Sequence, residues 1–244
     1  MTGKGSIAIV GAGDFIGAAI ARRFAREGHP VHGGRRRAER QDALADSIAA
    51  TGGRYTPHRL DARLEDEVVA FLDAAEADAP LDAVIFNIGA NVRFALTDTT
   101  ERVFRKVWEM ACAAGFLTTR EAARRMLPRG RGAIFLTGAT ASVRGASHYA
   151  AFASAKAGLR AVAQSAAREL GAQGIHVAHL IIDGGVDTDF VRERIRETGR
   201  DPETLPPDTL LRPETIADTY WTLFNQPRDA WTFELDLRPF SETW

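Results

Sequence analysis

Apolar residues occur along this chain in two kinds of run, and the two kinds alternate. Short runs rich in Val, Ile, Leu and Phe are typical of strands buried on both faces, and they lie at 6–10, 30–33, 54–60, 82–87, 132–137, 175–182 and 231–237. Between these runs, apolar positions with a period near 3.6 predict helices over 15–27, 37–50, 64–78, 100–127, 148–171 and 214–225. The alternation of strands with helices predicts an α/β protein.

Seven strands joined by helices predict one architecture in particular. Right-handed crossovers give a Rossmann-type, doubly wound, parallel seven-stranded sheet with helices on both faces, in three layers. We therefore expect one domain over residues 1–244. The segment 188–212 is charged, contains three prolines and interrupts the rhythm. It predicts an insertion above the carboxyl ends of the strands, which is either a substrate lid or a mobile surface loop.

Composition excludes several classes of protein. A net charge of −1 gives no electrostatic reason to expect nucleic acid or an anionic membrane as a partner. The single cysteine rules out an internal disulfide, and no apolar run is long enough to span a bilayer. The first strand follows the N-terminus so closely that we expect no signal peptide. These features predict a cytoplasmic protein.

The first strand–helix junction has the sequence GAGDFIG and predicts a nucleotide site. Gly11, Gly13 and Gly17 allow a tight turn whose backbone N–H groups, together with those of Phe15 and Ile16, approach a pyrophosphate at the helix N-terminus. The alternative is that the glycines serve only close packing of strand and helix. We expect a bound dinucleotide because the triplet stands at the first junction of an alternating chain.

The second predicted strand is followed by three arginines instead of a carboxylate. A site for NAD needs an acidic residue here for the ribose 2′-hydroxyl, and none occurs before Glu39. Arg35 and Arg36 instead suit the 2′-phosphate of NADP. The alternative is a solvated basic helix start, which the helix dipole disfavours. We therefore expect NADP, with NAD as the less favoured cofactor.

These motifs together resemble the short-chain dehydrogenase/reductase family over nearly the whole chain. The matching pieces are GAGDFIG, Asp61, NIG at 87–89, AKAGL at 155–159 and GGVDT at 184–188. The resemblance implies binding of pyrophosphate, adenine, ribose and nicotinamide carboxamide, roles that pass to Gly11, Gly17, Asp61, Asn87, Gly89, Val186 and Thr188. It also implies that Lys156 donates to the nicotinamide ribose.

The chain departs from the family pattern where the chemistry is expected. The catalytic tyrosine position is Phe152, the serine position is Ala139 and the asparagine position is Cys112. Phe15 replaces the middle glycine of the turn, and Asp183–Gly184 replaces the family's Pro-Gly. Of the four catalytic residues only Lys156 remains. A phenylalanine cannot donate a proton, so reduction of a carbonyl here needs another acid.

Other residues near the expected nicotinamide offer polar groups. Tyr149 lies on the helix face of Phe152 and Lys156, although packing at the helix start is an alternative role. Thr140 could orient a carbonyl, and Asp183 could act as acid or base, or merely cap the turn that follows it. With Lys156 these are our candidate catalytic residues. Cys112 has no sequence neighbour that stabilises a thiolate, and we expect no metal site.

Three functions remain open from the sequence. The favoured one is an NAD(P)(H)-dependent oxidoreductase acting on the carbonyl or alcohol of a small hydrophobic substrate, with a non-standard proton donor. A second is a catalytically inactive homologue that acts as a cofactor-binding partner subunit or sensor, and a third is a non-redox enzyme on the same fold. The resemblance implies a homodimer or homotetramer, or a hetero-oligomer with an intact homologue. Two of the four tryptophans lie in 229–244, which predicts an intersubunit contact at the C-terminus.

Overall fold

A computed structural model describes residues 3–242 and has one seven-stranded sheet in the order β3-β2-β1-β4-β5-β6-β7, with every neighbouring pair parallel. The strands are β1 (Ser6–Val10), β2 (Pro30–Arg35), β3 (Arg54–Arg59), β4 (Leu81–Phe86), β5 (Gly132–Thr137), β6 (Ile175–Ile182) and β7 (Glu234–Leu237). The order reverses between β1 and β4, where doubly wound sheets bind ligands. The predicted Rossmann-type fold is confirmed.

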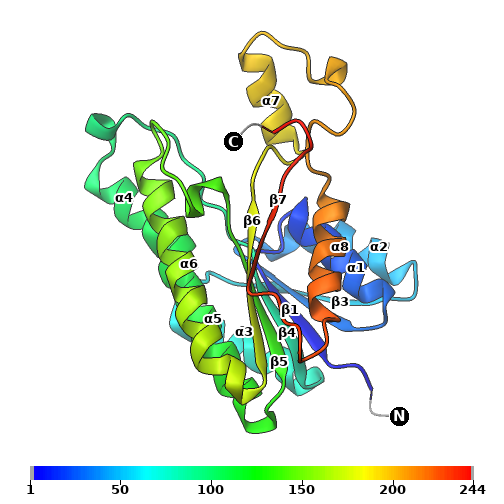
Figure 1. Ribbon diagram of the computed structural model, residues 1–244. Coiled ribbons are helices and arrows are strands. Elements are labelled where there is room, and N and C mark those ends of the chain that lie inside the picture. Colours follow the sequence, from blue (N-terminus) through cyan, green and yellow to red (C-terminus); the bar gives the residue numbers. More distant parts are fainter. Residues whose placement is uncertain (1–2, 243–244) are drawn as a thin grey trace.

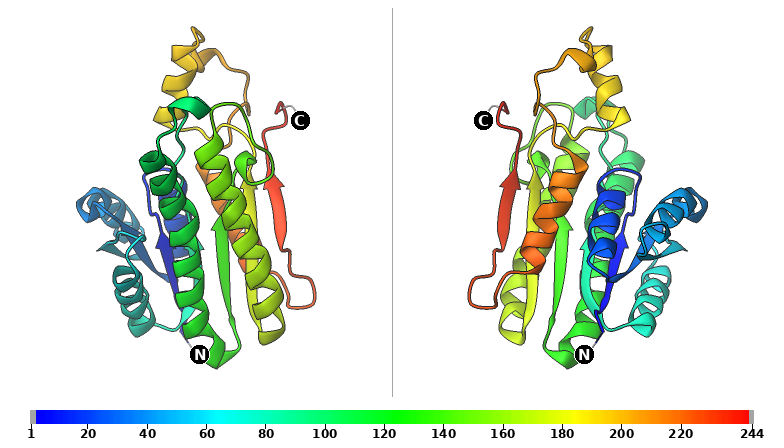
Figure 2. Two further views of the ribbon diagram at one scale, coloured as in Figure 1. Left: turned by 90° about the vertical axis from the view of Figure 1, so that its left-hand side faces the viewer. Right: turned by 90° about the vertical axis from the view of Figure 1, so that its right-hand side faces the viewer.

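Helices cover both faces of the sheet (Figure 1). Their bounds are α1 (Ile16–Arg26), α2 (Asp42–Ala49), α3 (Glu65–Asp78), α4 (Glu101–Trp108), α5 (Ala114–Met126), α6 (Ala150–Leu170), α7 (Asp189–Glu197) and α8 (Pro213–Phe224). The side views separate α3 to α6 on one face from α1 and α8 on the other, while α7 stands beyond the ends of the strands (Figure 2). No helix within residues 3–242 is long and apolar enough to cross a bilayer.

The central strands are largely apolar because both of their faces are buried. In β1, Ile9 packs into the cluster that contains Phe24 and Tyr220, whereas its neighbour Val10 packs into the cluster on the opposite face. Successive side chains of a strand point to opposite faces, so each strand contributes to both clusters. This places the ends of β1, β4, β5 and β6 on a rigid base.

Two predicted elements differ from the structure. The expected helix over 100–127 is interrupted by a π-helical turn at Glu109–Ala113, where buried Cys112 lies against Gly158 of α6. The expected last strand starts later, at Glu234, because the Trp231 ring stacks on His176 and Thr232 N–H donates to the Gln226 side chain. Both differences depend on contacts between distant parts of the chain.

The segment 188–212 contains a helix that the sequence did not predict. Helix α7 begins after Thr188, whose Oγ1 accepts from Val191 N–H at 3.1 Å. The two ends of the segment meet, because Asp187 N–H donates to Leu211 O and Leu211 N–H donates to Gly185 O, each at 2.8 Å. The segment is therefore an ordered projection with a closed base.

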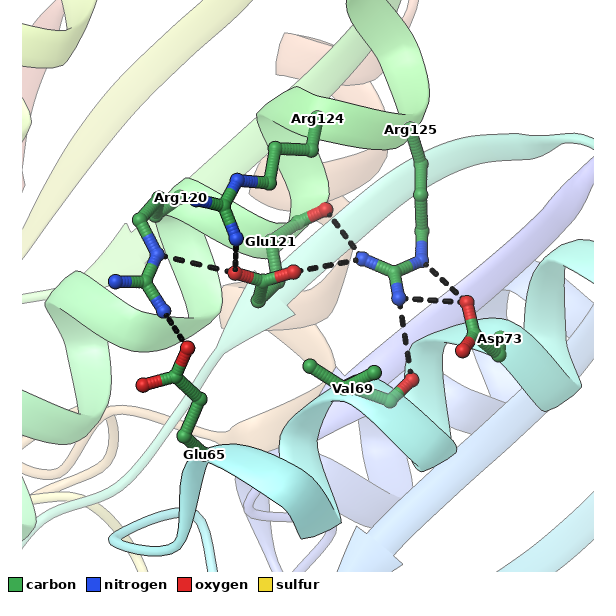
Figure 3. A network of polar contacts seen from close by, with 7 residues as sticks. All are labelled: Glu65, Val69, Asp73, Arg120, Glu121, Arg124 and Arg125. Atoms are coloured by element: carbon green, nitrogen blue, oxygen red, sulfur yellow. Dashed lines mark hydrogen bonds and ion pairs between the residues drawn. The ribbon is translucent and has the colours of Figure 1, made fainter.

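A buried carboxylate lies between α3 and α5, on the face of the sheet that α3 to α6 cover (Figure 3). Glu121 accepts from Arg120, Arg124 and Arg125, and Arg125 also reaches Asp73 and the Val69 carbonyl on α3. Burial alone would raise the pKa of Glu121, but the hydrogen bonds from Arg125 and Arg120 hold it below its ordinary value. The network fixes α3 against α5, and no part of it faces the site described next.

Candidate cofactor and active site

The glycine turn after β1 is held close to β4. Gly11 has φ +94°, and a Cβ there would lie 2.7 Å from Asn87 O, so glycine fits both the conformation and the space. Gly11 and Ala12 N–H groups both donate to Gly34 O on β2. Gly13 is different, since a Cβ added there would meet no atom within 4 Å. Contacts with β2 and β4 thus fix one side of the turn, and the side at Gly13 is open.

At the start of α1 the backbone N–H groups of Phe15, Ile16 and Gly17 have no partner within residues 3–242, whereas Ala18 N–H donates to Gly13 O. Phe15, the residue before the helix, makes no capping hydrogen bond, and the first turn contains no acidic residue. Phe15 and Ile16 line a cavity beside the turn. Free N–H groups and the positive end of the helix dipole make such a terminus a site for an anion. The predicted pyrophosphate position therefore has the required space and donors.

A cavity of about 690 Å³ extends from the glycine turn toward β2 and β3, and we call it the arginine-rich cavity. Its arginines are Arg35, Arg36, Arg37, Arg40 and Arg63. Two of these are already paired within the protein: Arg35 donates to Asp14 at 2.5 Å, and Arg63 Nε donates to Asp61 at 2.8 Å. The hydrogen bonds from Arg63 lower the pKa of Asp61. Arg36, which is exposed, makes no ion pair within residues 3–242 and is the better placed of the two predicted phosphate ligands.

A second cavity of about 670 Å³ lies over the carboxyl ends of β4, β5 and β6, and we call it the apolar cavity. Many of its lining side chains are aliphatic or aromatic, among them Phe15, Tyr149, Phe152 and Phe190. It shares Gly11, Gly13, Ile88 and Gly89 with the arginine-rich cavity. The two cavities are therefore neighbours along one cleft that crosses the topological switch point of the sheet.

Lys156 is buried in the wall of the apolar cavity. Its Nζ donates to Thr137 O at 2.8 Å and to Ile88 O at 2.9 Å, and lies 6.0 Å from the centre of the Phe152 ring. Burial lowers the pKa of Lys156 to about 7. The lysine thus ties α6 to the ends of β4 and β5 through their backbones.

Asn87 connects the glycine turn to the interior. Its Nδ2 donates to Gly11 O at 3.1 Å, and its Oδ1 accepts from Thr137 Oγ1 at 3.1 Å. The Thr137 hydroxyl also contacts the Tyr220 hydroxyl of α8 at 2.6 Å, where burial raises the tyrosine pKa. The sequence interpretation missed Thr137 and Tyr220. Thr137 could have been found, because it ends a strand that adjoins the one leading to Asn87.

Thr140 and Asp183 are brought together at the ends of β5 and β6. The Thr140 hydroxyl donates to Asp183 Oδ1 at 2.5 Å. Thr140 lines the apolar cavity, whereas Asp183 lies behind it, buried, with Arg238 Nη2 3.0 Å from its Oδ2. The two residues thus place a hydroxyl group at the cavity wall with a carboxyl group directly behind it.

The remaining predicted residues separate into those that line the apolar cavity and those that do not. Tyr149, Val186 and Thr188 line it together with Ala139, while Asp61 lines the arginine-rich cavity instead. The Tyr149 ring packs near Phe152, with centroids 6.5 Å apart. Cys112 is buried, and burial raises the pKa of its thiol. Within residues 3–242 no group of three His, Cys, Asp or Glu side chains is placed to hold a metal.

Comparison with known proteins gives consistent matches. A family model described as short chain dehydrogenase matches residues 6–199. The cis-4-hydroxycyclohexanecarboxylate dehydrogenase of Sinomonas cyclohexanicum is 32% identical, over 86% of this chain and 85% of that protein. The 3-oxoacyl-[acyl-carrier-protein] reductase MabA of Mycobacterium avium is 31% identical, over 78% of this chain and 72% of that protein.

Solved structures match over almost the full length. A short-chain dehydrogenase from Rhodopseudomonas palustris superposes with a TM-score of 0.84 at 54% identity, covering 97% of this chain and 99% of that one. An alcohol dehydrogenase from the archaeon Thermococcus sibiricus, complexed with 5-hydroxy-NADP, has a TM-score of 0.84 at 25% identity and covers 98% of each chain.

Proposed function

The chain belongs to the short-chain dehydrogenase family, and from that premise we propose that it is an NADP(H)-dependent oxidoreductase that interconverts an alcohol and a carbonyl in the apolar cavity. We propose further that it is an atypical member, in which Thr140 and Asp183 handle the proton that tyrosine handles elsewhere in the family. The contact between these two residues carries the proposal.

The cofactor assignment rests on the arginine-rich cavity and the glycine turn. Arg36 would bind the 2′-phosphate, the N-terminus of α1 would bind the pyrophosphate, and Lys156 would donate to the nicotinamide ribose. The Thermococcus sibiricus relative, solved with 5-hydroxy-NADP, supports this choice of cofactor. When bound, NADP(H) would accept or supply the hydride.

In alcohol oxidation the substrate hydroxyl must lose its proton. The Thr140 hydroxyl faces the cavity and donates to Asp183 at 2.5 Å. As Thr140 Oγ1 takes the substrate proton, it passes its own proton to the Asp183 carboxylate, so threonine ends unchanged and aspartate ends protonated. Reduction of a carbonyl runs the same transfers in reverse.

Steady-state kinetics with a panel of small cyclic and aliphatic alcohols test this proposal, followed by the absorbance of NADPH. We expect Thr140→Val and Asp183→Asn each to lower kcat by about a hundredfold or more, the usual contribution of general acid–base catalysis. NADPH affinity, measured by fluorescence, should stay within about twofold in both variants. Thr222→Val, an exposed threonine on α8, is the matched control.

Two results would overturn the proposal. If Asp183→Asn turned over like the wild type, the proton pair would be wrong even though the enzyme is active. If NADPH bound but no alcohol or carbonyl at high enzyme concentration changed its absorbance, the chain would be a non-catalytic member of the family.

For the assembly we propose a homo-oligomer. Exposed aromatic side chains on the α4–α5 face support it: Phe104, Trp108 and Phe116 are each at least 40% exposed. In the predicted C-terminal contact, Phe240 is 80% exposed, while residues 243–244 lie outside the described residues. Light scattering should give a multiple of the 26.5 kDa chain mass, and a monomer would contradict this.

A further inference from the structure

Two arginines, Arg144 and Arg194, are among the side chains that line the largely apolar cavity. Arg144 follows the short helical turn Thr140–Ser142, and Arg194 lies on α7, so segments far apart in sequence place them on the same cavity. The same cavity is lined by the aromatic side chains of Tyr149, Phe152 and Phe190. An apolar space with a few charged groups at one end is the usual form of a site for a small amphipathic molecule.

The binding capacity of both guanidinium groups is largely unused. Arg194 lies 5.2 Å from the centre of the Phe190 ring and makes no ion pair within residues 3–242. Among the same residues, the carboxylate nearest Arg144 is Asp183 at 4.0 Å, and Asp183 is already paired more closely with Arg238. Asp14, the acidic residue that lines the cavity, is paired with Arg35. The cavity edge therefore has an excess of positive charge.

Resting on the proposed function, we propose that the substrate is a small apolar alcohol or ketone that carries a carboxylate, and that Arg144 and Arg194 bind this carboxylate. Guanidinium groups bind carboxylates with paired, charge-assisted hydrogen bonds. The apolar body of the substrate lies against Phe152 and Phe190, and its hydroxyl or carbonyl meets Thr140. The phosphates of the cofactor have their own donors at the α1 N-terminus and in the arginine-rich cavity.

Calorimetric titration tests the carboxylate site without requiring turnover. The probes are cyclohexanecarboxylate and cyclohexanecarboxamide, which have the same shape and no hydroxyl, titrated into protein saturated with NADP. We expect the wild type to bind the carboxylate about tenfold more tightly than the amide, the effect of one charge-assisted bond. This preference should shrink as salt rises, because the edge is partly exposed.

Variants assign the preference to the two arginines. Arg144→Gln and Arg194→Gln should each weaken binding of the carboxylate, and the double variant should bind carboxylate and amide equally. Arg196→Ala is the control: Arg196 lies on the same helix, pairs with Glu193 and does not line the cavity, so the preference should persist. Circular dichroism verifies that each variant is folded. If the double variant is not folded, the two single variants test the assignment of the carboxylate site.

The inference fails if the wild type binds the two probes equally or binds neither. It also fails if the Gln variants keep the preference but lose NADPH affinity by about tenfold, because the arginines would then serve the cofactor. Its failure is distinguishable from failure of the proposed function. A carboxylate preference without any oxidation of 4-hydroxycyclohexanecarboxylate would support the site and contradict the activity.

Discussion

The two cavities of the cleft are similar in volume and opposite in chemistry. The arginine-rich cavity, about 690 Å³, is bordered by five arginines and the open front of the glycine turn. The apolar cavity, about 670 Å³, is bordered largely by aliphatic and aromatic side chains, Phe152 and Ala139 among them. The difference indicates that cofactor recognition and reaction chemistry are separable on this fold.

The same comparison shows where the chain could diverge without losing its fold. The floor shared by both cavities consists of Gly11, Gly13, Ile88 and Gly89, and it is held by backbone and by Asn87. Side chains of the apolar cavity can change above this floor without disturbing it. The first two predictions below test the shared floor and the buried lysine, and the last two test each cavity separately.

The largest effect is expected at the shared glycine turn. In Gly17→Ala the new Cβ would lie 2.8 Å from both Ala12 Cα and Gly11 O, and these backbone atoms must move. We expect the free energy of unfolding to fall by about 3 kcal/mol, as in other overpacked interiors, measured by urea denaturation.

Gly13→Ala is the matched variant for the same turn. Its Cβ would project into open space, so stability should stay within about 0.5 kcal/mol while NADPH affinity falls by about tenfold, because the methyl group occupies cofactor space. Normal NADPH binding by Gly13→Ala would show that the cofactor does not lie on this turn.

The next effect concerns Lys156 and pH. Burial lowers its pKa to about 7, whereas lysine in an unfolded chain has a pKa of about 10.4. Between these values the unfolded chain holds a proton that the folded protein has released, so the free energy of unfolding rises with pH. We expect a gain of about 2 kcal/mol between about pH 7.5 and 9.

Lys156→Met should remove this gain, as urea denaturation at several pH values would reveal. Burial raises the pKa of Cys112, which acts in the opposite direction at high pH, so the difference between wild type and variant is the quantity to compare. Equal slopes in the two proteins would mean that Lys156 stays protonated.

A smaller effect is confined to the arginine-rich cavity. Arg36→Ala should weaken NADPH binding by about tenfold and leave NADH binding unchanged, because one charge-assisted contact to the 2′-phosphate is lost. Fluorescence titration measures both affinities, and Arg26→Ala, exposed at the end of α1, is the control. Equal losses for the two cofactors would contradict the assignment of Arg36 to the phosphate.

The smallest effect is expected in the apolar cavity. With Thr140 and Asp183 handling the proton, Phe152→Tyr should change kcat by less than about threefold in the wild type. In a Thr140→Val background the same substitution should raise kcat by about tenfold, because a phenol near Lys156 restores a proton donor. A large gain in the wild type alone would mean that the Thr140–Asp183 pair does not work efficiently.

The central strands of the sheet could be predicted from the sequence because they are buried on both faces and carry a strong apolar signal. Helix α7 could not. None of its residues is buried, its few apolar side chains stand among many charged ones, and its N-cap at Thr188 depends on how the ends of the segment meet. The π-helical turn was likewise hidden, because the packing of Cys112 on Gly158 joins two separate helices.

The candidate residues could be predicted singly but not as pairs. Thr140 and Asp183 were each predicted as candidate catalytic residues, yet the hydrogen bond between them joins residues 43 positions apart. Arg35 and Arg36 looked equivalent in sequence, and the structure separates them because the turn brings Asp14 to Arg35. Such pairings follow from strand order and turn geometry, which a local pattern does not contain.

The closed base of the segment that carries α7 makes this part of the protein a natural unit for exchange. Two backbone hydrogen bonds join Gly185 and Asp187 to Leu211, and Arg192 pairs with Asp187 and Glu203 inside the segment. Residues between these anchors can therefore be replaced, lengthened or shortened while the sheet keeps its register. Grafting segments from other family members onto this base would be a direct way to engineer new substrate preferences onto an unchanged cofactor site.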